Sequence, residues 1–233
     1  MALRSLVRCR NIPSTVEIRN RKINDKHLLK HFFYMSWSNG ELSRDDLRFY
    51  ARQYFVHVRA FPTYLSEMHC RCEDLESRRI IASNLAEEEA TSPTHPELWL
   101  DFAAGLGAAR ESVTGAAAGP RVTALVDTYR SVARLETELA AAGMYCYEKQ
   151  IPAIAAAKIA GLQEHYGVND PSTVRYFKVH ESADVEHAAQ WEVMLSCKEV
   201  NQSRAAGVAD EVLGALWAAL DEIHEGCRTA GAN

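Results

Sequence analysis

Apolar residues recur at steps of three and four along most of the chain, the spacing of a helix that buries one face. Val122, Leu125, Val126, Tyr129 and Val132 illustrate the pattern, because all five fall on one side of a helix. No stretch alternates apolar and polar residues as a half-buried strand does. We therefore predict an all-α fold, with helices over residues 25–36, 43–68, 75–90, 96–102, 122–143, 144–165, 171–187 and 205–227.

Capping residues and prolines set the expected limits of these helices. Ser43 followed by Asp46 is typical of a capping box. Asp170 before Pro171 is a strong start signal for the helix that follows. Pro62 is expected to kink or divide its helix, because a proline cannot donate to the carbonyl four residues back.

The composition is that of an ordinary globular protein. Hydrophobic residues make up 47% of the 233 residues and charged ones 24%, which suits one domain with a sizeable core. We expect this domain to cover residues 1–233, with flexible ends at 1–22 and 228–233. The net charge of −5 gives no reason to expect nucleic-acid binding. No apolar run reaches membrane-spanning length and no secretory signal is recognisable, so we expect a cytoplasmic protein without membrane contact.

The cysteines do not form a recognisable metal or disulfide motif. Their spacing lacks the paired arrangement of a zinc site, and in a reducing compartment scattered thiols are mostly buried small hydrophobes. We interpret all six as structural: Cys9, Cys70, Cys72, Cys146, Cys197 and Cys227. Cys146 is of further interest because it lies two residues before Glu148, a candidate ligand discussed below.

The strongest chemical signal is a stripe of three side chains in the last third of the chain. His180, Asp184 and His187 are separated by steps of four and three, so at about 100° per residue they lie within an arc of about 60° on one helix face. Two imidazoles and a carboxylate on one stripe can bind a first-row transition metal and leave positions open for dioxygen. The same spacing also arises by chance among packed or solvated histidines, so the stripe alone does not distinguish a metal site from ordinary helix residues.

Three further candidate ligands lie on other predicted helices. Glu88 and His95 belong to the sequence EEEATSPTH, and Glu148 belongs to YCYEKQIP. Six donors, three histidines and three carboxylates, are typical of a dinuclear site in a helical bundle, where each helix contributes one or two inward-facing ligands. These donors favour the metal interpretation of the stripe.

Nearby prolines affect the expected backbone at two of these candidate ligands. Pro152 leaves the carbonyl of Glu148 without its usual donor, so we expect the helix to kink there. His95 lies between Pro93 and Pro96, and the residue before a proline is biased away from helical geometry. We therefore expect His95 in a short connection between helices.

Lys158 interrupts an apolar stretch, AAAKIAGL. The usual interpretation is a surface lysine whose stem covers apolar surface while its amine reaches water. If Lys158 is buried instead, its pKa falls and its amine becomes nucleophilic. Aromatic residues that could surround the site are mostly expected in the core, although a tyrosine beside an oxidising metal can lose an electron and a proton: Phe33, Tyr34, Trp37, Tyr54, Tyr64, Tyr147 and Tyr176.

Five stretches carry a family resemblance and together cover residues from about 25 to 200: HFFYMSWSNGEL (31–42), YFVHVRAFPTYLS (54–66), NLAEEEATSPTHPELW (84–99), YCYEKQIPAIAAAKIAGL (145–162) and YFKVHESADVEHA (176–188). In this order and spacing they resemble the Chlamydia protein associating with death domains and its bacterial relatives. That branch is related to the PQQ-synthesis oxidase and has the haem-oxygenase-like fold.

The resemblance implies a bundle of about seven helices around a dinuclear non-haem centre. Carried over position by position, the family's metal ligands fall on Glu88, His95, Glu148, His180, Asp184 and His187. Glu87 and Glu89 flank Glu88, and the family pattern selects Glu88 by its distance to His95. The cofactors would be two metal ions, iron with iron or manganese, with O₂ as co-substrate and an external reductant.

The implied activity is the O₂-dependent formation of 4-aminobenzoate for folate biosynthesis, in which the protein itself is consumed. Tyr34 would be the source of the aromatic ring and Lys158 the source of the amino group. Tyr147 and Tyr176 would support radical transfer or hydrogen bonding. The partners would be O₂ and, if an external phenol replaces Tyr34, a small aromatic molecule; a homodimer is left open.

Other functions stay open at this point. A metal-free oxidase of a small aromatic or quinone precursor, like the PQQ enzyme, would keep the fold, but buried acids without a cation are costly. A haem enzyme with His27 or His31 as axial ligand and a thiaminase-like reaction through Cys146 rest on weaker analogy. A module that binds death-domain proteins is suggested by the family's name, and it would have no use for six metal donors.

Overall fold

A computed structural model describes residues 15–196 and 201–230 of the chain. These residues form eleven α-helices and one short 3₁₀ helix, and no strand, which confirms the all-α prediction. In chain order the elements are α1 (Thr15–Asp25), η1 (Leu28–Lys30), α2 (Phe32–Ser38), α3 (Arg44–Arg71), α4 (Leu75–Glu89), α5 (His95–Gly105), α6 (Arg110–Thr114), α7 (Pro120–Ala133), α8 (Thr137–Glu148), α9 (Ile151–Glu164), α10 (Pro171–Ser196) and α11 (Gln202–Ala230).

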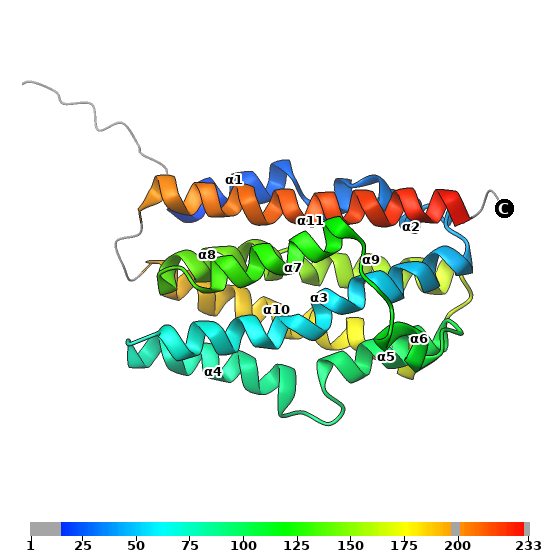
Figure 1. The fold of residues 1–233 in the computed structure, drawn as a ribbon, viewed down its shortest axis with the longest axis horizontal. Helices are drawn as coiled ribbons and strands as arrows, with labels where there is room; N and C mark the ends of the chain where they lie inside the picture. Colours follow the sequence, from blue (N-terminus) through cyan, green and yellow to red (C-terminus); the bar gives the residue numbers. More distant parts are fainter. Residues whose placement is uncertain (1–14, 197–200, 231–233) are drawn as a thin grey trace, which may run out of the picture.

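The helices run mostly along one long axis (Figure 1). α11 extends along one side of the bundle with α1 and α2 against it, and α7 and α8 lie beneath it (Figure 1). α10 passes through the middle and contacts α4, α5, α8 and α9. The four helices that carry the candidate ligands, α4, α5, α8 and α10, therefore meet around α10.

Three stretches that the sequence predicts as continuous helices are divided. In the stretch 25–36, α1 ends at Asp25, and η1 and α2 follow as separate elements. The stretch 144–165 breaks after Glu148, and α9 then begins with Pro152 in its first turn. A proline is tolerated there because the N–H groups of the first turn have no acceptor within the helix. The stretch 122–143 ends at Ala133, and α8 begins after a short turn. Such breaks, together with short helices at the connections, explain why the described residues hold more helices than the seven that the resemblance implies.

At two prolines the structure has a helix where the sequence allowed a break. Pro62 does not divide α3, because the apolar side chains before and after it stay packed in the core and carry the helix across one missing hydrogen bond. His95 does not lie in a connection but is the first residue of α5. Thr94 caps that helix and forms a capping box with Glu97, which fixes the entry of the chain and tolerates a proline in the first turn.

Other local signals are confirmed. Ser43 and Asp46 form the predicted capping box at the start of α3. The carboxylate of Asp170 accepts from the backbone N–H of Thr173 at 2.9 Å, as a helix cap does. Residues 15–22 and 228–230, which the sequence pattern leaves in flexible ends, lie in α1 and α11, and the rest of those ends falls outside the described residues.

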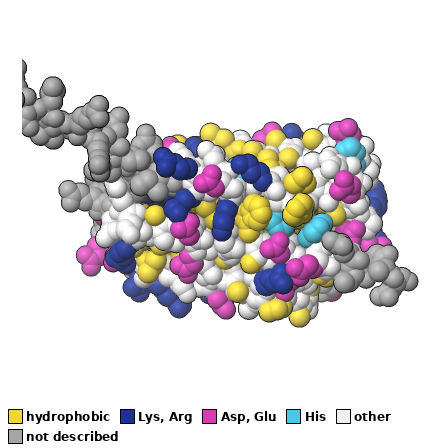
Figure 2. All heavy atoms as spheres, turned by 90° about the horizontal axis from the view of Figure 1, so that it is seen from above, with side chains coloured by type: hydrophobic (Ala, Val, Ile, Leu, Met, Phe, Trp, Pro, Cys, Tyr) yellow, Lys and Arg dark blue, Asp and Glu magenta, His cyan; other side chains and the backbone are white. Residues whose placement is uncertain are grey.

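Within the described ranges, no helix combines the length and apolarity needed to cross a lipid bilayer. The face of the molecule that carries α1, α2 and α11 mixes basic and acidic side chains, with apolar residues between them (Figure 2). This face therefore presents no extended field of one sign.

Candidate metal centre

Six buried side chains with metal-binding atoms gather where α4, α5, α8 and α10 meet. They form two groups of three, and within each group the donor atoms lie within 4.8 Å of one another: Glu88, His95 and His180 in the first, and Glu148, Asp184 and His187 in the second. All six positions that the family resemblance selects are thus brought together. The stripe on α10 contributes to both groups, because its three side chains face the same way.

Helix phase decides which glutamate of the EEE run enters the site. The buried stripe of α4 passes through Ile81 and Asn84 to Glu88 at steps of three and four. Glu89 is exposed and Glu87 is half-buried. The selection of Glu88 from the family pattern therefore agrees with the side chain that the helix turns inward.

Two other candidate ligands lie at helix ends. Glu148 is the last residue of α8, before the break, and His95 is the first residue of α5. Their side chains can approach the stripe of α10 from two directions because α5 and α8 both pack against α10. The rings of His95 and His180 lie 4.5 Å apart, centre to centre.

The histidines of α10 are oriented by acceptors outside the cluster. His180 Nδ1 donates to the backbone carbonyl of Tyr176 at 2.7 Å, so Nε2 keeps its lone pair. His187 Nε2 lies 3.0 Å from the carboxylate of Glu87, while its Nδ1 lies 3.5 Å from Asp184 Oδ1. An acceptor behind a histidine fixes the tautomer and raises its basicity as a metal ligand.

The electrostatics of the cluster are unfavourable without a cation. Burial raises the pKa of Asp184 to about 6, against the opposing effect of His187. The pKa of Glu148 is raised by burial and by the charge of Asp184. Burial lowers the pKa of His180 to about 3. Burial also acts to lower the pKa of His187, but the surrounding carboxylates outweigh it and raise that pKa to about 9.

Unpaired oxygen atoms in the second group of three suit a bound cation. Glu148 Oε2 accepts from the indole N–H of Trp191, but Glu148 Oε1 has no hydrogen-bond partner in the described part of the chain, and neither has Asp184 Oδ2. A buried carboxylate oxygen without a partner is costly, and a metal ion removes that cost. Imidazole and carboxylate ligands in equal number suit iron and manganese.

A small enclosed cavity adjoins the cluster at His180. Its volume is about 20 Å³, enough for roughly one molecule the size of water. Its lining includes all four residues that the resemblance assigns to catalysis, Tyr34, Tyr147, Lys158 and Tyr176. The ring of Tyr176 contacts that of His180 at a tilt of 33°, with ring centres 4.2 Å apart.

Lys158 is buried among aromatic rings and does not reach solvent. Its Nζ lies 5.2 Å from the centre of the Tyr34 ring and donates to the hydroxyl of Tyr50. Burial lowers the pKa of Lys158 to about 7. Of the two interpretations of this lysine, the buried one therefore holds, and about half of its amine is neutral at pH 7.

The structure disfavours the residues on which the haem and thiaminase interpretations depend. His31 lies 2.9 Å from the carboxylate of Asp221 through Nε2 and accepts from the backbone N–H of Phe33 through Nδ1. His27 caps the 3₁₀ helix η1. Cys146 is fully buried, and burial raises the pKa of its thiol to about 12, which disfavours a reactive thiolate.

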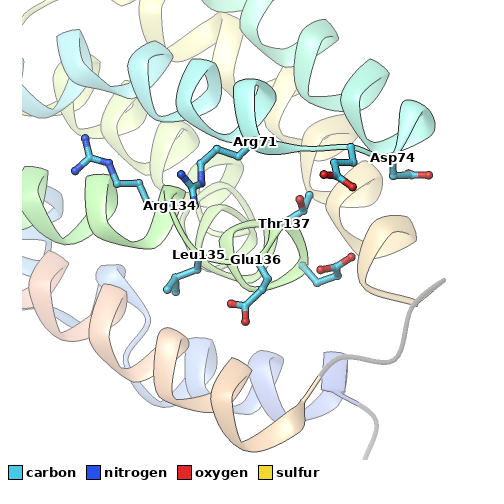
Figure 3. Close-up of a pocket in the computed structure, with 8 residues that line it drawn as sticks. Arg71, Asp74, Arg134, Leu135, Glu136 and Thr137 are labelled. Atoms are coloured by element: carbon cyan, nitrogen blue, oxygen red, sulfur yellow. The ribbon is translucent and has the colours of Figure 1, made fainter.

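A larger hollow, of about 530 Å³, opens on the surface between the end of α3 and the turn from α7 to α8 (Figure 3). Charged side chains of both signs line it, among them Arg71, Asp74, Arg134 and Glu136. None of the six donors lines this hollow. Its size therefore does not make it the candidate active site.

Three residues that contact the site were not singled out by the sequence. Trp191 lies one turn beyond His187 and continues the stripe of α10, so helical spacing could have found it. Tyr50 lies one turn before Tyr54 on α3 and has the same signal. Glu87 had no signal, because its partner is on another helix.

Replacing Glu87 with glutamine should weaken metal binding at the second group. The carboxylate behind His187 would become a neutral amide, and loss of such an outer partner typically lowers metal affinity about 10–100-fold. Anaerobic titration with ferrous or manganous ions against a chelating indicator measures the effect. Glu89→Gln on the exposed side of α4 is the control and should bind as the parent does; equal affinities in both variants would contradict the orienting role.

Comparisons with known proteins give consistent matches. A family model described as iron-containing redox enzyme matches residues 48–220. A 4-aminobenzoate synthase of Chlamydia pneumoniae is 38% identical over 207 residues, which is 88% of this chain and 92% of the relative. A pyrroloquinoline-quinone synthase of Xanthomonas campestris is 25% identical over 84% of this chain and 80% of the relative. A Shewanella denitrificans domain of haem-oxygenase-like fold superposes with a TM-score of 0.79 at 15% identity, covering 92% of this chain and 94% of that one.

Proposed function

The chain belongs to the family of iron-containing redox enzymes, and we propose that within this family it is an O₂-dependent 4-aminobenzoate synthase that consumes its own side chains. Family membership confirms the resemblance seen in the sequence. The observation that carries the proposal is the enclosed cavity in which the amine of Lys158 lies over the ring of Tyr34, beside the six-donor cluster. The similarity to the 4-aminobenzoate synthase of Chlamydia pneumoniae supports the same product.

The two groups of donors would each hold one metal ion, iron with iron or manganese. When bound, the ions would supply the oxidising chemistry with O₂ that organic side chains lack. The protein's own contribution is to turn the six donors inward, to hold His180 and His187 through acceptors behind them, and to keep bulk water out.

Tyr34 has the carbon skeleton that the product needs. 4-Aminobenzoate is an aromatic ring with one further carbon, which corresponds to the ring and Cβ of tyrosine. Its release from Tyr34 requires the Cα–Cβ bond to break, Cβ to be oxidised to a carboxylate, and the phenolic oxygen to be replaced by nitrogen. Burial raises the pKa of Tyr34, so its phenol enters the reaction protonated and its oxidation must release a proton.

Lys158 is placed to supply that nitrogen. Its neutral form carries a lone pair at neutral pH because burial has lowered its pKa to about 7. The hydroxyl of Tyr50 and the ring of Tyr34 fix the position of the amine. The cavity volume of about 20 Å³ leaves room for roughly one water-sized molecule, which favours the side chains of the protein over an external phenol as the aromatic groups that react.

Isotope labelling tests the proposal directly. Protein made with ring-labelled tyrosine is reduced, loaded with iron and manganese, and exposed to O₂ in the presence of unlabelled free tyrosine. We expect labelled 4-aminobenzoate, at most one per chain, and an intact mass that falls by a fragment lost at Tyr34. Tyr34→Phe should yield no product.

The matched control is Tyr166→Phe, which changes a buried tyrosine that does not line the cavity. It should yield as much product as the parent. Unlabelled product with an unchanged protein mass would show that an external phenol is the substrate and would refute the self-consuming reaction. Absence of 4-aminobenzoate from the loaded parent would refute the reaction class.

A further inference from the structure

All nine tyrosines of the chain are buried, and several form a continuous line leading away from the cavity. The hydroxyl of Tyr54 donates to that of Tyr147 at 3.3 Å. The ring of Tyr147 lies 5.2 Å from that of His57 and 6.1 Å from that of Tyr129, centre to centre. Tyr64 stacks on Tyr129 at 5.5 Å. Unbroken aromatic contact therefore connects the cavity to Tyr64 on α3.

Tyr64 and His57 form a hydrogen-bonded pair in this line. The hydroxyl of Tyr64 lies 3.4 Å from His57 Nδ1. His57 is fully buried, and burial lowers its pKa to about 3, so its ring is neutral and one nitrogen can accept a proton. Neither His57 Nε2 nor the hydroxyl of Tyr129 has a hydrogen-bond partner among the described residues. An apolar core of the same shape would avoid this cost, so packing alone does not account for these groups.

The far end of the line lies close beneath the surface. Burial raises the pKa of Tyr64, and the charges of Arg130 and Asp127 on α7 also act on its phenol. Both of these charged side chains are more than half exposed. The line thus begins at the cavity and ends under the surface between α3 and α7, which pack against each other.

The cluster itself is closed to reductants. Its six residues are at most 7% exposed, and the adjoining cavity of about 20 Å³ admits roughly one water-sized molecule. A reductant in solution therefore cannot touch the cluster. Electrons that discharge an oxidised centre must cross the protein, and side chains that can be oxidised and reduced again divide that crossing into short transfers between neighbouring rings.

We propose that Tyr64, with His57 as its proton acceptor, is a redox-active pair that carries oxidising equivalents from the metal cluster to the surface between α3 and α7. The inference rests on the proposed function, because it needs an oxidising centre. One electron moves from Tyr64 toward the cluster through the rings of Tyr129 and Tyr147, and the phenolic proton of Tyr64 moves to His57 Nδ1. This leaves a neutral tyrosyl radical and an imidazolium.

Reduction of the Tyr64 radical restores the pair to its starting state, with no atom gained or lost. A one-electron reductant in solution, such as ascorbate, returns an electron to the Tyr64 radical, and the proton returns from His57 to the phenol oxygen. The net change is one electron moved from the reductant toward the cluster. Without His57, oxidation of Tyr64 would leave a cation on the phenol in an apolar core, which is strongly unfavourable.

The test uses metal-free protein and a photo-oxidant attached near the end of the line. Cys70 is exposed on α3, six residues after Tyr64 and so about 9 Å along the helix axis. A thiol-linked ruthenium bipyridyl complex is attached to it in a background with Cys9 and Cys197 replaced by serine. After flash oxidation, transient absorption and freeze-quench EPR should detect a neutral tyrosyl radical that forms more slowly in heavy water.

Three variants locate the radical. Tyr64→Phe should lose most of the EPR signal, and His57→Gln should slow radical formation and remove the solvent isotope effect. Tyr166→Phe, a buried tyrosine outside the line, should behave as the parent. If His57→Gln does not fold, the solvent isotope effect in the parent and the loss of the EPR signal in Tyr64→Phe still test the inference. The same signal in Tyr64→Phe as in the parent overturns the inference.

This test is independent of the proposed reaction. A radical on Tyr64 in metal-free protein supports the pair even if the loaded protein makes no 4-aminobenzoate. Conversely, 4-aminobenzoate formed by a protein in which flash oxidation never reaches Tyr64 would leave the proposed function standing and refute the pair.

Discussion

Glu148→Gln is expected to stabilise the metal-free protein and to abolish its reaction. The side chain is almost fully buried, with one carboxylate oxygen unpaired, so a neutral amide in its place should raise the free energy of unfolding by about 1–3 kcal/mol at pH 7. Because its pKa is higher in the folded state, wild-type Glu148 lowers stability only above its unfolded pKa. The gain should therefore shrink toward zero as the pH falls to about 4.

The loaded protein should respond in the opposite direction. Without the charge of Glu148, the second group keeps only Asp184 and His187, and we expect that metal and all 4-aminobenzoate formation to be lost. Denaturant unfolding after chelator treatment measures the first effect, and elemental analysis with product assay measures the second. Glu164→Gln, on the exposed side of α9, is the control and should change neither. Full metal content in Glu148→Gln would remove this residue from the ligand set.

The parts of the site that the sequence predicted are those in which one helix decides the geometry. The stripe of His180, Asp184 and His187 needs only the pitch of a helix, and the structure turns all three to one side. The caps at Ser43 and Asp170 likewise depend on residues three positions away. The other three candidate ligands were visible as donors on other helices, but only the family resemblance joined them to the stripe, since nothing local indicates that α4, α5 and α8 converge on α10.

Features decided by several elements together were not predictable from local rules. His95 is a separate case, in which a second local signal decides: the capping box of Thr94 and Glu97 outweighs the preference against a helix before proline and places His95 in the first turn of α5. Glu87 is half-buried on the outer side of α4, and only the approach of α10 makes it a partner of His187. For Lys158, helix periodicity could not decide between surface and core, because that depends on which helices cover α9.

Lys158→Met should be the most stabilising single substitution near the cavity. The pKa of this lysine is about 7 in the folded state and about 10.5 in the unfolded state, so between these values the unfolded chain holds a proton that the folded chain has lost. That difference destabilises the native protein most at and below pH 7. Replacement by an apolar side chain of similar length should therefore add about 3–4 kcal/mol at pH 7 and less than about 1 kcal/mol at pH 10.

The same substitution should end the reaction, because it removes the amine that lies over Tyr34. Denaturant unfolding at pH 7 and pH 10 tests the stability, and product assay after loading tests the chemistry. Lys178→Met on the exposed side of α10 is the matched control, since it changes the same atoms in water and should be near neutral in both measurements. A pH-independent gain would mean that Lys158 is not neutralised by burial. Continued formation of 4-aminobenzoate would show that the nitrogen comes from elsewhere. The two measurements thus separate the stability cost of burying this amine from its role as the nitrogen donor.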